Sequence, residues 1–273
     1  MQAKLHFISG LPRSGSTLLS ALLSQNPRFH AAMSSPLTSL VNALLREMSQ
    51  GNEYGMFYSP EQRQRIVKGC FEAYYADIPP DGLAFDTGRM WTSKMPLLSN
   101  LFPGSKVICC VRNVAWVLDS IETLTRSNHL EPSRMFAFDA SSTVYGRLEG
   151  LTAGTGMVGS ALFALREAVF GAEADRLLLV RYDSLVSDPL GVLAKLYAFI
   201  GEPLYRHDPQ RIEPFPEAEE FDARIGAPGL HRLGPVVRAN RRPTILPADL
   251  FKRYEVFSFW EKPDEMPKGL RVI

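Results

Sequence analysis

Short apolar runs alternate with amphipathic stretches along most of the chain. The apolar runs are expected to be buried strands, and they lie at residues 5–8, 83–87, 107–111 and 177–180. The amphipathic stretches carry apolar residues every three or four positions and predict helices, which we place after residue 16 and over 37–49, 60–75, 96–102, 114–127, 159–171 and 189–200. Strands that alternate with helices in this way predict an α/β fold, a doubly wound parallel sheet flanked by helices.

The remaining segments have weaker patterns. Residues 28–36 are expected to form a loop, and residues 128–158 to cover a site or bind an acceptor molecule. The last segment, 201–273, is rich in proline, glycine and charge, with one short helix expected near 247–255. We expect the whole chain to form one domain, in which a core of about 200 residues is followed by a C-terminal arm that folds over the site.

The stretch between the first strand and the first helix has the pattern of an anion-binding loop. Gly10 and Gly15 have the spacing of the P-loop glycines, and Thr17 ends the pattern, but Ser16 stands where that loop has lysine. The cation of the loop is Arg13 instead, which can fork across two oxygens of one group. Loop N–H groups and the positive end of the helix dipole suit a phosphate-like anion. We therefore expect a P-loop-like site without magnesium-dependent triphosphate chemistry; a plain turn is the alternative.

A second basic position follows the 107–111 strand. Arg112 stands where triphosphatases commonly place an aspartate that holds Mg²⁺, so we expect a second anion there and no metal. Ser120 follows eight residues later in the predicted helix, and Arg181 ends another strand. Because ligands lie beyond the carboxyl ends of such strands, these positions predict a ligand with several negative charges. A surface charge at Arg112 and a free helix hydroxyl at Ser120 are the plainer alternatives.

Composition limits the binding partners and the cellular compartment that we expect for this chain. The 273 residues are 45% hydrophobic and carry a net charge of +1, so we expect no general affinity for nucleic acid or for an anionic membrane. Of the three cysteines, Cys109 and Cys110 are adjacent in an apolar run, which favours reduced thiols and a cytoplasmic location. We find no run of about 18 apolar residues and expect no membrane span. A strand that starts by residue 4 leaves no room for a signal peptide.

Two of these motifs together resemble those of sulfotransferases that use 3′-phosphoadenosine 5′-phosphosulfate (PAPS). Residues 12–19, Pro-Arg-Ser-Gly-Ser-Thr-Leu-Leu, resemble the family's 5′-phosphosulfate loop. Val111-Arg112 followed by Ser120 resembles its 3′-phosphate motif. Residues 180–185 are similar to its Arg-Tyr-Glu-Asp-Leu segment, with one residue fewer before the leucine.

Further likenesses indicate the branch that sulfates tyrosine. Ser93-Lys94-Met95-Pro96 is similar to the lysine-containing segment of the Golgi protein-tyrosine sulfotransferases. The opening stretch and residues 85–91 also resemble the tyrosine-sulfating enzymes of plant-associated bacteria. The order of the motifs agrees with the family over approximately residues 5–200.

The resemblance implies a role for each matching residue. The sulfate and 5′-phosphate would be held by Arg13, Ser14, Gly15, Ser16 and Thr17. The 3′-phosphate would be held by Arg112 and Ser120, with Tyr182 near the adenosine end. A C-terminal basic loop closes over the cofactor in this family, and the candidates here are Arg232, Arg238, Arg241 and Arg242. PAPS would be the donor and 3′-phosphoadenosine 5′-phosphate (PAP) the product, with no metal.

The catalytic residues depart from the family pattern. The tyrosine sulfotransferases carry a glutamate base after the loop arginine, where this chain reads Ala32-Met33-Ser34-Ser35, and the cytosolic small-molecule enzymes use a histidine where this chain has Lys94. We expect Lys94, with Arg13, to stabilise the transferring and leaving groups. We expect Asp86, at a strand end, to accept the proton. A structural role for Asp86 beside Arg89 is the alternative, and the further candidates for the base are His30, Glu122 and His129.

The expected function is transfer of a sulfuryl group from PAPS to an acceptor hydroxyl. A tyrosine of a peptide or protein is the first candidate acceptor, and a small phenol or alcohol is the second. A P-loop kinase and a non-catalytic nucleotide-binding module stay open as alternatives of another class. A kinase should need Mg²⁺ and a loop lysine, whereas a binding module would hold PAP and transfer nothing. The oligomeric state is left open, a homodimer included.

Overall fold

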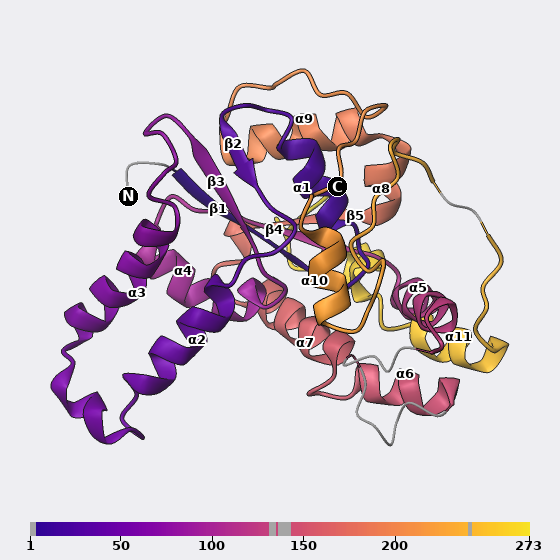
Figure 1. The fold of residues 1–273 in the computed structure, drawn as a ribbon, viewed down its shortest axis with the longest axis horizontal. Helices are drawn as coiled ribbons and strands as arrows, with labels where there is room; N and C mark the ends of the chain where they lie inside the picture. Colours follow the sequence, from indigo (N-terminus) through magenta and orange to yellow (C-terminus); the bar gives the residue numbers. More distant parts are fainter. Residues whose placement is uncertain (1–3, 131–134, 136–142, 240–241) are drawn as a thin grey trace.

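The chain folds around a six-stranded parallel sheet. The computed structural model describes residues 4–130, 135, 143–239 and 242–273. The strand order is β2-β3-β1-β4-β5-β6 (Figure 1). The strands are β1 Lys4–Gly10, β2 Phe29–Ala31, β3 Leu83–Thr87, β4 Val107–Val111, β5 Leu177–Arg181 and β6 Arg271–Val272. The expected α/β doubly wound sheet is therefore confirmed.

Helices cover both faces of the sheet (Figure 1). Successive residues of β1 serve the two faces: Phe7 packs into one apolar cluster and Ile8 into the other, and both are fully buried. The Ile8 face is covered by α1 Ser16–Leu23, α8 Tyr182–Ser187 and α9 Pro189–Ile200. The Phe7 face is covered by α2 Leu37–Glu47, α3 Pro60–Tyr74, α4 Met95–Leu101, α5 Val114–Ser127, α6 Val144–Thr152, α7 Met157–Phe170 and α11 Ala248–Glu255.

Several elements were not predicted because they are too short to show a period. The three residues of β2 lie inside the expected loop 28–36, and the two residues of β6 pair with Leu178 and Leu179 at the other edge of the sheet. In the weakly patterned region, α6 forms, whereas residues 131–134 and 136–142 lie outside the described part of the chain. The arm contains α10 Ala218–Arg224 and the short 3-10 turns η5 Phe259–Glu261 and η6 Pro263–Glu265.

One segment has the length and hydropathy of a membrane-crossing helix. Val144–Phe170 is long enough and apolar enough to cross a membrane by these two criteria alone. The sequence, by contrast, predicts no membrane span. In the structure the segment contains two helices, α6 and α7, separated by a turn at residues 153–156. Val158, Leu165 and Val169 of α7 are buried in the apolar cluster on the Phe7 face. This burial is typical of the core helix of a globular fold.

The loops that follow β1, β3, β4 and β5 all leave the sheet at the carboxyl ends of its strands, and the candidate site forms there. The chain passes from β1 through residues 11–15 into α1, and from β4 through Arg112 and Asn113 into α5. After β3, residues 88–90 lead into the 3-10 turn η2 Trp91–Lys94. The arm returns to this end of the sheet, because residues 230–234 and 236–238 line one cavity together with the β1–α1 loop.

Replacing Gly10 with alanine should destabilise the fold by roughly 2–4 kcal/mol. Gly10 has a φ of 146°, and a Cβ there would collide with the Cys110 backbone of β4. Urea unfolding measures the loss. Gly69→Ala is the control, because a Cβ at Gly69 in α3 meets nothing within 4 Å. That control should be neutral or stabilising by up to about 1 kcal/mol; equal stability of Gly10→Ala and the wild type would contradict this account of the β1 end.

Candidate active site

Two residues of the loop between β1 and α1 have an unusual backbone conformation. Arg13 has a φ of 60° and Gly15 a φ of 97°, both in the left-handed region. A Cβ on Gly15 would lie 3.0 Å from the ring of Tyr182, so only glycine fits there. Gly15 is the N-cap residue of α1, and Ser16 and Thr17 form its first turn. The free N–H groups of this first turn are suited to an anion.

Ser14 fastens the loop to the sheet. Its buried hydroxyl lies 2.5 Å from the carbonyl oxygen of Leu11 and 2.8 Å from that of Cys110, and can donate to either. Because the hydroxyl is turned toward these carbonyls, the contribution of Ser14 to a bound anion is left to its backbone N–H. Gly15, Ser16 and Thr17 line the cavity above the loop, as the sequence predicts.

Two adjoining cavities meet at this loop. The first, which we call the loop cavity, has a volume of about 250 Å³ and is lined by residues 8–13, 15–18, 87–89 and 230–234, among others. The second, which we call the α5 cavity, has a volume of about 240 Å³ and is lined by Trp116, Ser120, Thr123, Leu124 and Ser127 of α5. Three side chains line both cavities: Arg13, Arg112 and Tyr182.

The two arginines between the cavities are fixed by neighbouring groups. Arg13 donates from Nε to the Ser120 hydroxyl at 3.1 Å and from Nη1 to the Leu230 carbonyl. Arg112 donates from Nη1 to the Arg13 carbonyl at 3.3 Å, and its guanidinium lies 4.3 Å from the centre of the Tyr182 ring. The structure thus brings the four residues Arg13, Arg112, Ser120 and Tyr182 together around the α5 cavity.

Arg13 and Arg112 carry positive charges that are poorly solvated, and such charges favour the binding of an anion. Burial lowers the pKa of Arg13 below its ordinary value, and the positive charge of Arg112 lowers it further. Burial also lowers the pKa of Arg112. Within the described ranges, no carboxylate forms an ion pair with either guanidinium. Two neighbouring, partly desolvated cations without a carboxylate are unfavourable until a multiply charged anion lies between them.

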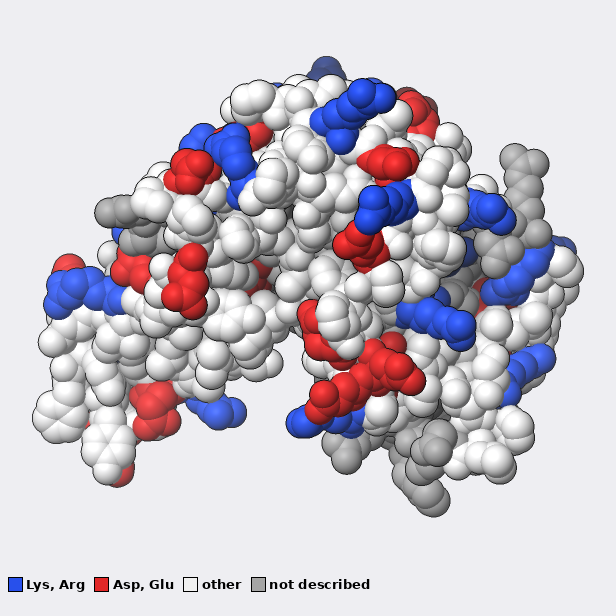
Figure 2. All heavy atoms as spheres, turned by 45° about the horizontal axis from the view of Figure 1, so that its top comes forward, with Lys and Arg blue, Asp and Glu red and all other residues white. Residues whose placement is uncertain are grey.

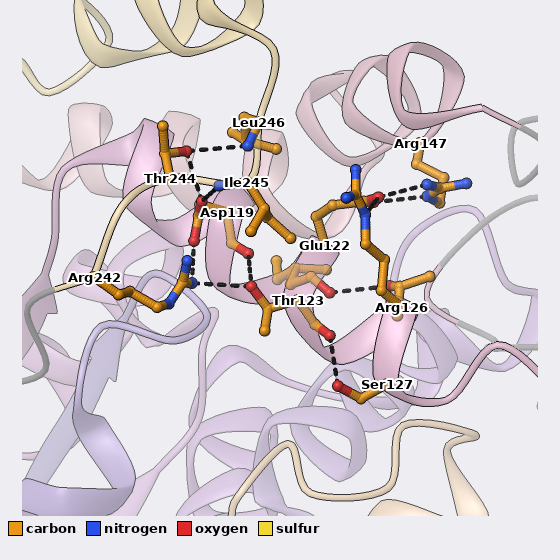
Figure 3. A network of polar contacts seen from close by, with 12 residues as sticks. Asp119, Glu122, Thr123, Arg126, Ser127, Arg147, Arg242, Thr244, Ile245 and Leu246 are labelled. Atoms are coloured by element: carbon orange, nitrogen blue, oxygen red, sulfur yellow. Dashed lines mark hydrogen bonds and ion pairs between the residues drawn. The ribbon is translucent and has the colours of Figure 1, made fainter.

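The arm brings further arginines to the cavities. Arg232 and Arg238 line the loop cavity, and Arg242 lines the α5 cavity. Figure 3 shows how Arg242 is held: it donates to the Asp119 carboxylate and to the Thr123 hydroxyl, the latter at 2.9 Å. Asp119 also accepts from the Thr244 hydroxyl at 2.6 Å and from the Ile245 N–H at 2.8 Å, so one buried carboxylate anchors this part of the arm to α5. Arg241 lies outside the described residues.

The comparisons with known proteins identify the family. The model of the Sulfotransferase family matches residues 6–206, which is most of the chain. This chain belongs to the sulfotransferase family. The expected family is thereby confirmed. The comparison with curated proteins gave no match.

Solved sulfotransferases share the fold at low sequence identity. The sulfotransferase of Alicyclobacillus acidocaldarius is 14% identical, with a TM-score of 0.51 over 82% of this chain and 91% of that chain. The sulfotransferase domain from the curacin biosynthetic pathway is 16% identical, with a TM-score of 0.50 over 99% and 94%. The sulfotransferase domain of the Synechococcus PCC 7002 olefin synthase is 21% identical, with a TM-score of 0.48 over 93% and 94%. At these identities the first two comparisons show a shared fold and no more.

Asp86 does not reach either cavity of the sulfotransferase site. Its buried carboxylate accepts hydrogen bonds from the Ser35 hydroxyl, the Tyr75 hydroxyl and the Trp91 indole N–H, each with a contact of 2.7 Å. Burial raises the pKa of Asp86, and the three donors oppose that rise. The expected role as proton acceptor needs correction, because the carboxylate faces α3 and η2 and is occupied there. Asp86 joins β3 to these elements.

The other residues expected to handle the proton also lie away from the cavities. Glu122 is buried and pairs with Arg126 at 2.8 Å and with Arg147 at 2.7 Å, as Figure 3 shows. His30, on the edge strand β2, and His129, beyond the end of α5, are exposed and line neither cavity. The exposed strand-end residue Arg181 also lines neither.

Arg89, a cation that the sequence did not assign to the site, lines the loop cavity, whereas Lys94 does not. Lys94 ends η2, is half-buried and lines neither cavity. Arg89 lines the loop cavity, and its backbone carbonyl accepts a hydrogen bond from the Ser9 hydroxyl at 2.7 Å. Desolvation by the surrounding protein lowers the pKa of Arg89, although the residue is exposed. Arg89 lies two residues after the end of β3, and a cation just beyond a strand end, as at Arg112, is the sequence signal that could have found it.

Replacing Arg89 with alanine should lower sulfuryl transfer on the order of 10²-fold, because a cation that lines the loop cavity is lost. Lys94→Ala is the matched control and should change the rate little. Initial rates and the Kd for PAP, measured side by side, test this assignment. A larger loss in Lys94→Ala than in Arg89→Ala would restore Lys94 to the role that the sequence indicated.

Proposed function

We propose that this sulfotransferase moves a sulfuryl group from PAPS to the hydroxyl of an acceptor and releases PAP. The observation that carries the proposal is the pair Arg13 and Arg112, two partly buried cations shared by two adjoining cavities. A ligand with one anionic group in each cavity would satisfy both cations. PAPS has such a layout, with a phosphosulfate at one end of the nucleotide and a 3′-phosphate at the other.

The residues present fit this donor. The first turn of α1, with Gly15, Ser16 and Thr17, would hold the 5′-phosphosulfate, and Ser120 with Arg112 would hold the 3′-phosphate. Tyr182, against Arg112, would lie near the nucleoside, while Arg232 and Arg238 would add positive charge from the arm. PAPS, when bound, supplies a sulfuryl group on a good leaving group, so the protein has to position the reactants and stabilise charge.

Arg13 and the loop N–H groups neutralise the charge that develops on the phosphate as the sulfur–oxygen bond breaks. Arg89, which also lines the loop cavity, would add positive charge near the transferring group. No ligand set of three or more His, Cys, Asp or Glu side chains gathers among the described residues, and the proposal uses no metal ion.

For the acceptor, we propose a tyrosine of a peptide or protein, with a small phenol or alcohol as the second candidate. Figure 2 shows a deep hollow between the lobe of α2, η1 Glu53–Phe57 and α3 and the lobe that carries α10. The loops at the inner ends of the two lobes, with Met33 and Ser34 on one side and Leu230 on the other, line the loop cavity. An open hollow of this kind supports an acceptor larger than a free phenol.

Transfer of radiolabelled sulfate from PAPS to panels of tyrosyl peptides and small phenols tests the function and the acceptor together. Labelled peptide at a higher kcat/KM than labelled phenol supports the tyrosyl acceptor. The reverse order favours the small-molecule alternative. Binding of PAP without transfer to either panel would indicate a nucleotide-binding module and contradict the proposal.

A further inference from the structure

We propose that His231, oriented by Asp222, is the base that takes the proton from the acceptor hydroxyl. This inference rests on the proposed function, because it assigns the proton step of sulfuryl transfer. It concerns a residue pair in the arm that neither the motifs nor the sequence pattern singled out. Asp222 lies in α10 and His231 in the following loop, which lines the loop cavity.

Asp222 fixes both the ring and the backbone of His231. One carboxylate oxygen, Oδ1, lies 2.5 Å from Nδ1 of the imidazole, and the other, Oδ2, accepts the backbone N–H of His231 at 2.8 Å. Asp222 is only 1% exposed, so these contacts are sheltered from water. The edge of the ring also meets Phe221, with ring centres 5.4 Å apart. The orientation of the imidazole is therefore set by the fold of the arm.

This pairing leaves the correct nitrogen free to act as a base. An ionised carboxylate can only accept hydrogen bonds, so in the neutral ring Nδ1 carries the hydrogen and Nε2 carries the lone pair. Within the described part of the chain, Nε2 has no hydrogen-bond partner. A carboxylate that holds an imidazole in one tautomer also stabilises the positive charge that the ring acquires when it takes a proton.

The pair stands beside the cation at the centre of the site. The residue before His231, Leu230, accepts a hydrogen bond from Arg13 through its carbonyl, and the charge of Asp222 raises the pKa of Arg13 against the effect of burial. His231 therefore directly follows the residue whose carbonyl binds Arg13 of the β1–α1 loop. Among the candidate bases considered, which are Asp86, Glu122, His30, His129 and His231, His231 alone lines a cavity of the site.

The transfer of the proton and of the sulfuryl group needs no further reactant. As the acceptor oxygen forms its bond to sulfur, its proton passes to Nε2 of His231. The bond between sulfur and the 5′-phosphate oxygen breaks, and its electron pair stays on that oxygen, where Arg13 meets the added negative charge. The imidazolium is held by Asp222 until the products leave, after which it gives the proton to water.

The arrangement of the pair can be measured without any transfer reaction. In ¹⁵N spectra of the imidazoles, with the His231 signals assigned by their loss in His231→Gln, the neutral ring should carry its hydrogen on Nδ1. Asp222→Asn should change this tautomer, because an amide can donate to Nδ1 instead of accepting from it. A hydrogen on Nε2 in the wild type, or the same tautomer in Asp222→Asn, would overturn the orienting role of Asp222.

Kinetics test the role of the imidazole itself. His231→Gln should lower kcat by at least about 10²-fold and leave the Kd for PAP within about twofold of the wild type, whereas His129→Gln, the exposed control, should change neither. Added imidazole should recover part of the transfer in His231→Ala. An unchanged kcat in His231→Gln, a main effect on PAP affinity, or no recovery by imidazole would refute His231 as the base while leaving the proposed function in place. A wild type that neither binds PAP nor transfers sulfate would refute both.

Discussion

Replacing Arg13 with glutamine should lower sulfuryl transfer by about 10²–10³-fold. The guanidinium lies between the two cavities and is fixed by Ser120 and by the Leu230 carbonyl, so it is already oriented before the reaction begins. Glutamine keeps some hydrogen-bonding capacity but loses the charge that neutralises the leaving phosphate. Initial rates at saturating PAPS measure the loss in kcat, and a titration with PAP measures the loss in affinity.

The control for Arg13 is another arginine at a strand end. Arg181 ends β5, is exposed and lines neither cavity, so Arg181→Gln removes the same charge without touching the proposed site. Wild-type transfer is expected from this control, which shows that net charge alone is not responsible. Equal rates in Arg13→Gln and Arg181→Gln would show that the loop cation takes no part in the chemistry.

Replacing Arg112 with alanine should weaken PAP binding by roughly 2 kcal/mol or more, which is about 30-fold in Kd. The guanidinium lies 4.3 Å from the centre of the Tyr182 ring and lines the α5 cavity with Ser120, where the 3′-phosphate is proposed to lie. Calorimetry with PAP measures the effect. The loss should appear in donor affinity more than in kcat, because the 3′-phosphate does not take part in the bond change.

Arg112→Lys separates charge from geometry at this position. Lysine keeps the positive charge but cannot fork across two phosphate oxygens or stack flat on the Tyr182 ring, so its Kd should fall between those of the wild type and Arg112→Ala. A wild-type Kd in Arg112→Ala would mean that the α5 cavity does not hold the 3′-phosphate, whatever the result at Arg13.

The core of the fold could be predicted from the sequence because its signals are local. The strand at 107–111 is a continuous apolar run between turn residues, and the structure gives β4 the same bounds. The helix over 189–200 also matches, since Pro189 opens it and Gly201, in the left-handed region, closes it. By contrast, β2 and β6 are pairings at the sheet edges. Their three and two residues have no period to detect.

The sequence could predict that Arg13 and Arg112 lie at the same end of the sheet, but it could not predict the surroundings of Asp86 or the pairing of His231 with Asp222. Arg112 follows β4 directly and Arg13 lies in the loop three residues beyond β1, so the rule that ligands lie beyond strand ends was enough to bring them together. Asp86 also lies in a strand, but the sequence could not show that Tyr75 and Trp91 would fill its hydrogen-bonding capacity. His231 and Asp222 meet because the chain turns after α10 and brings the following loop back against that helix, a contact with no periodic pattern in the sequence.

The most direct measurement of the central claim is a calorimetric titration of the wild type with PAP in metal-free buffer and with ATP plus Mg²⁺. The account predicts that PAP binds without metal at one site per chain and that it binds more tightly than ATP with Mg²⁺. A preference for ATP with Mg²⁺, or a requirement for Mg²⁺ in PAP binding, would contradict the account and return the chain to the kinase alternative.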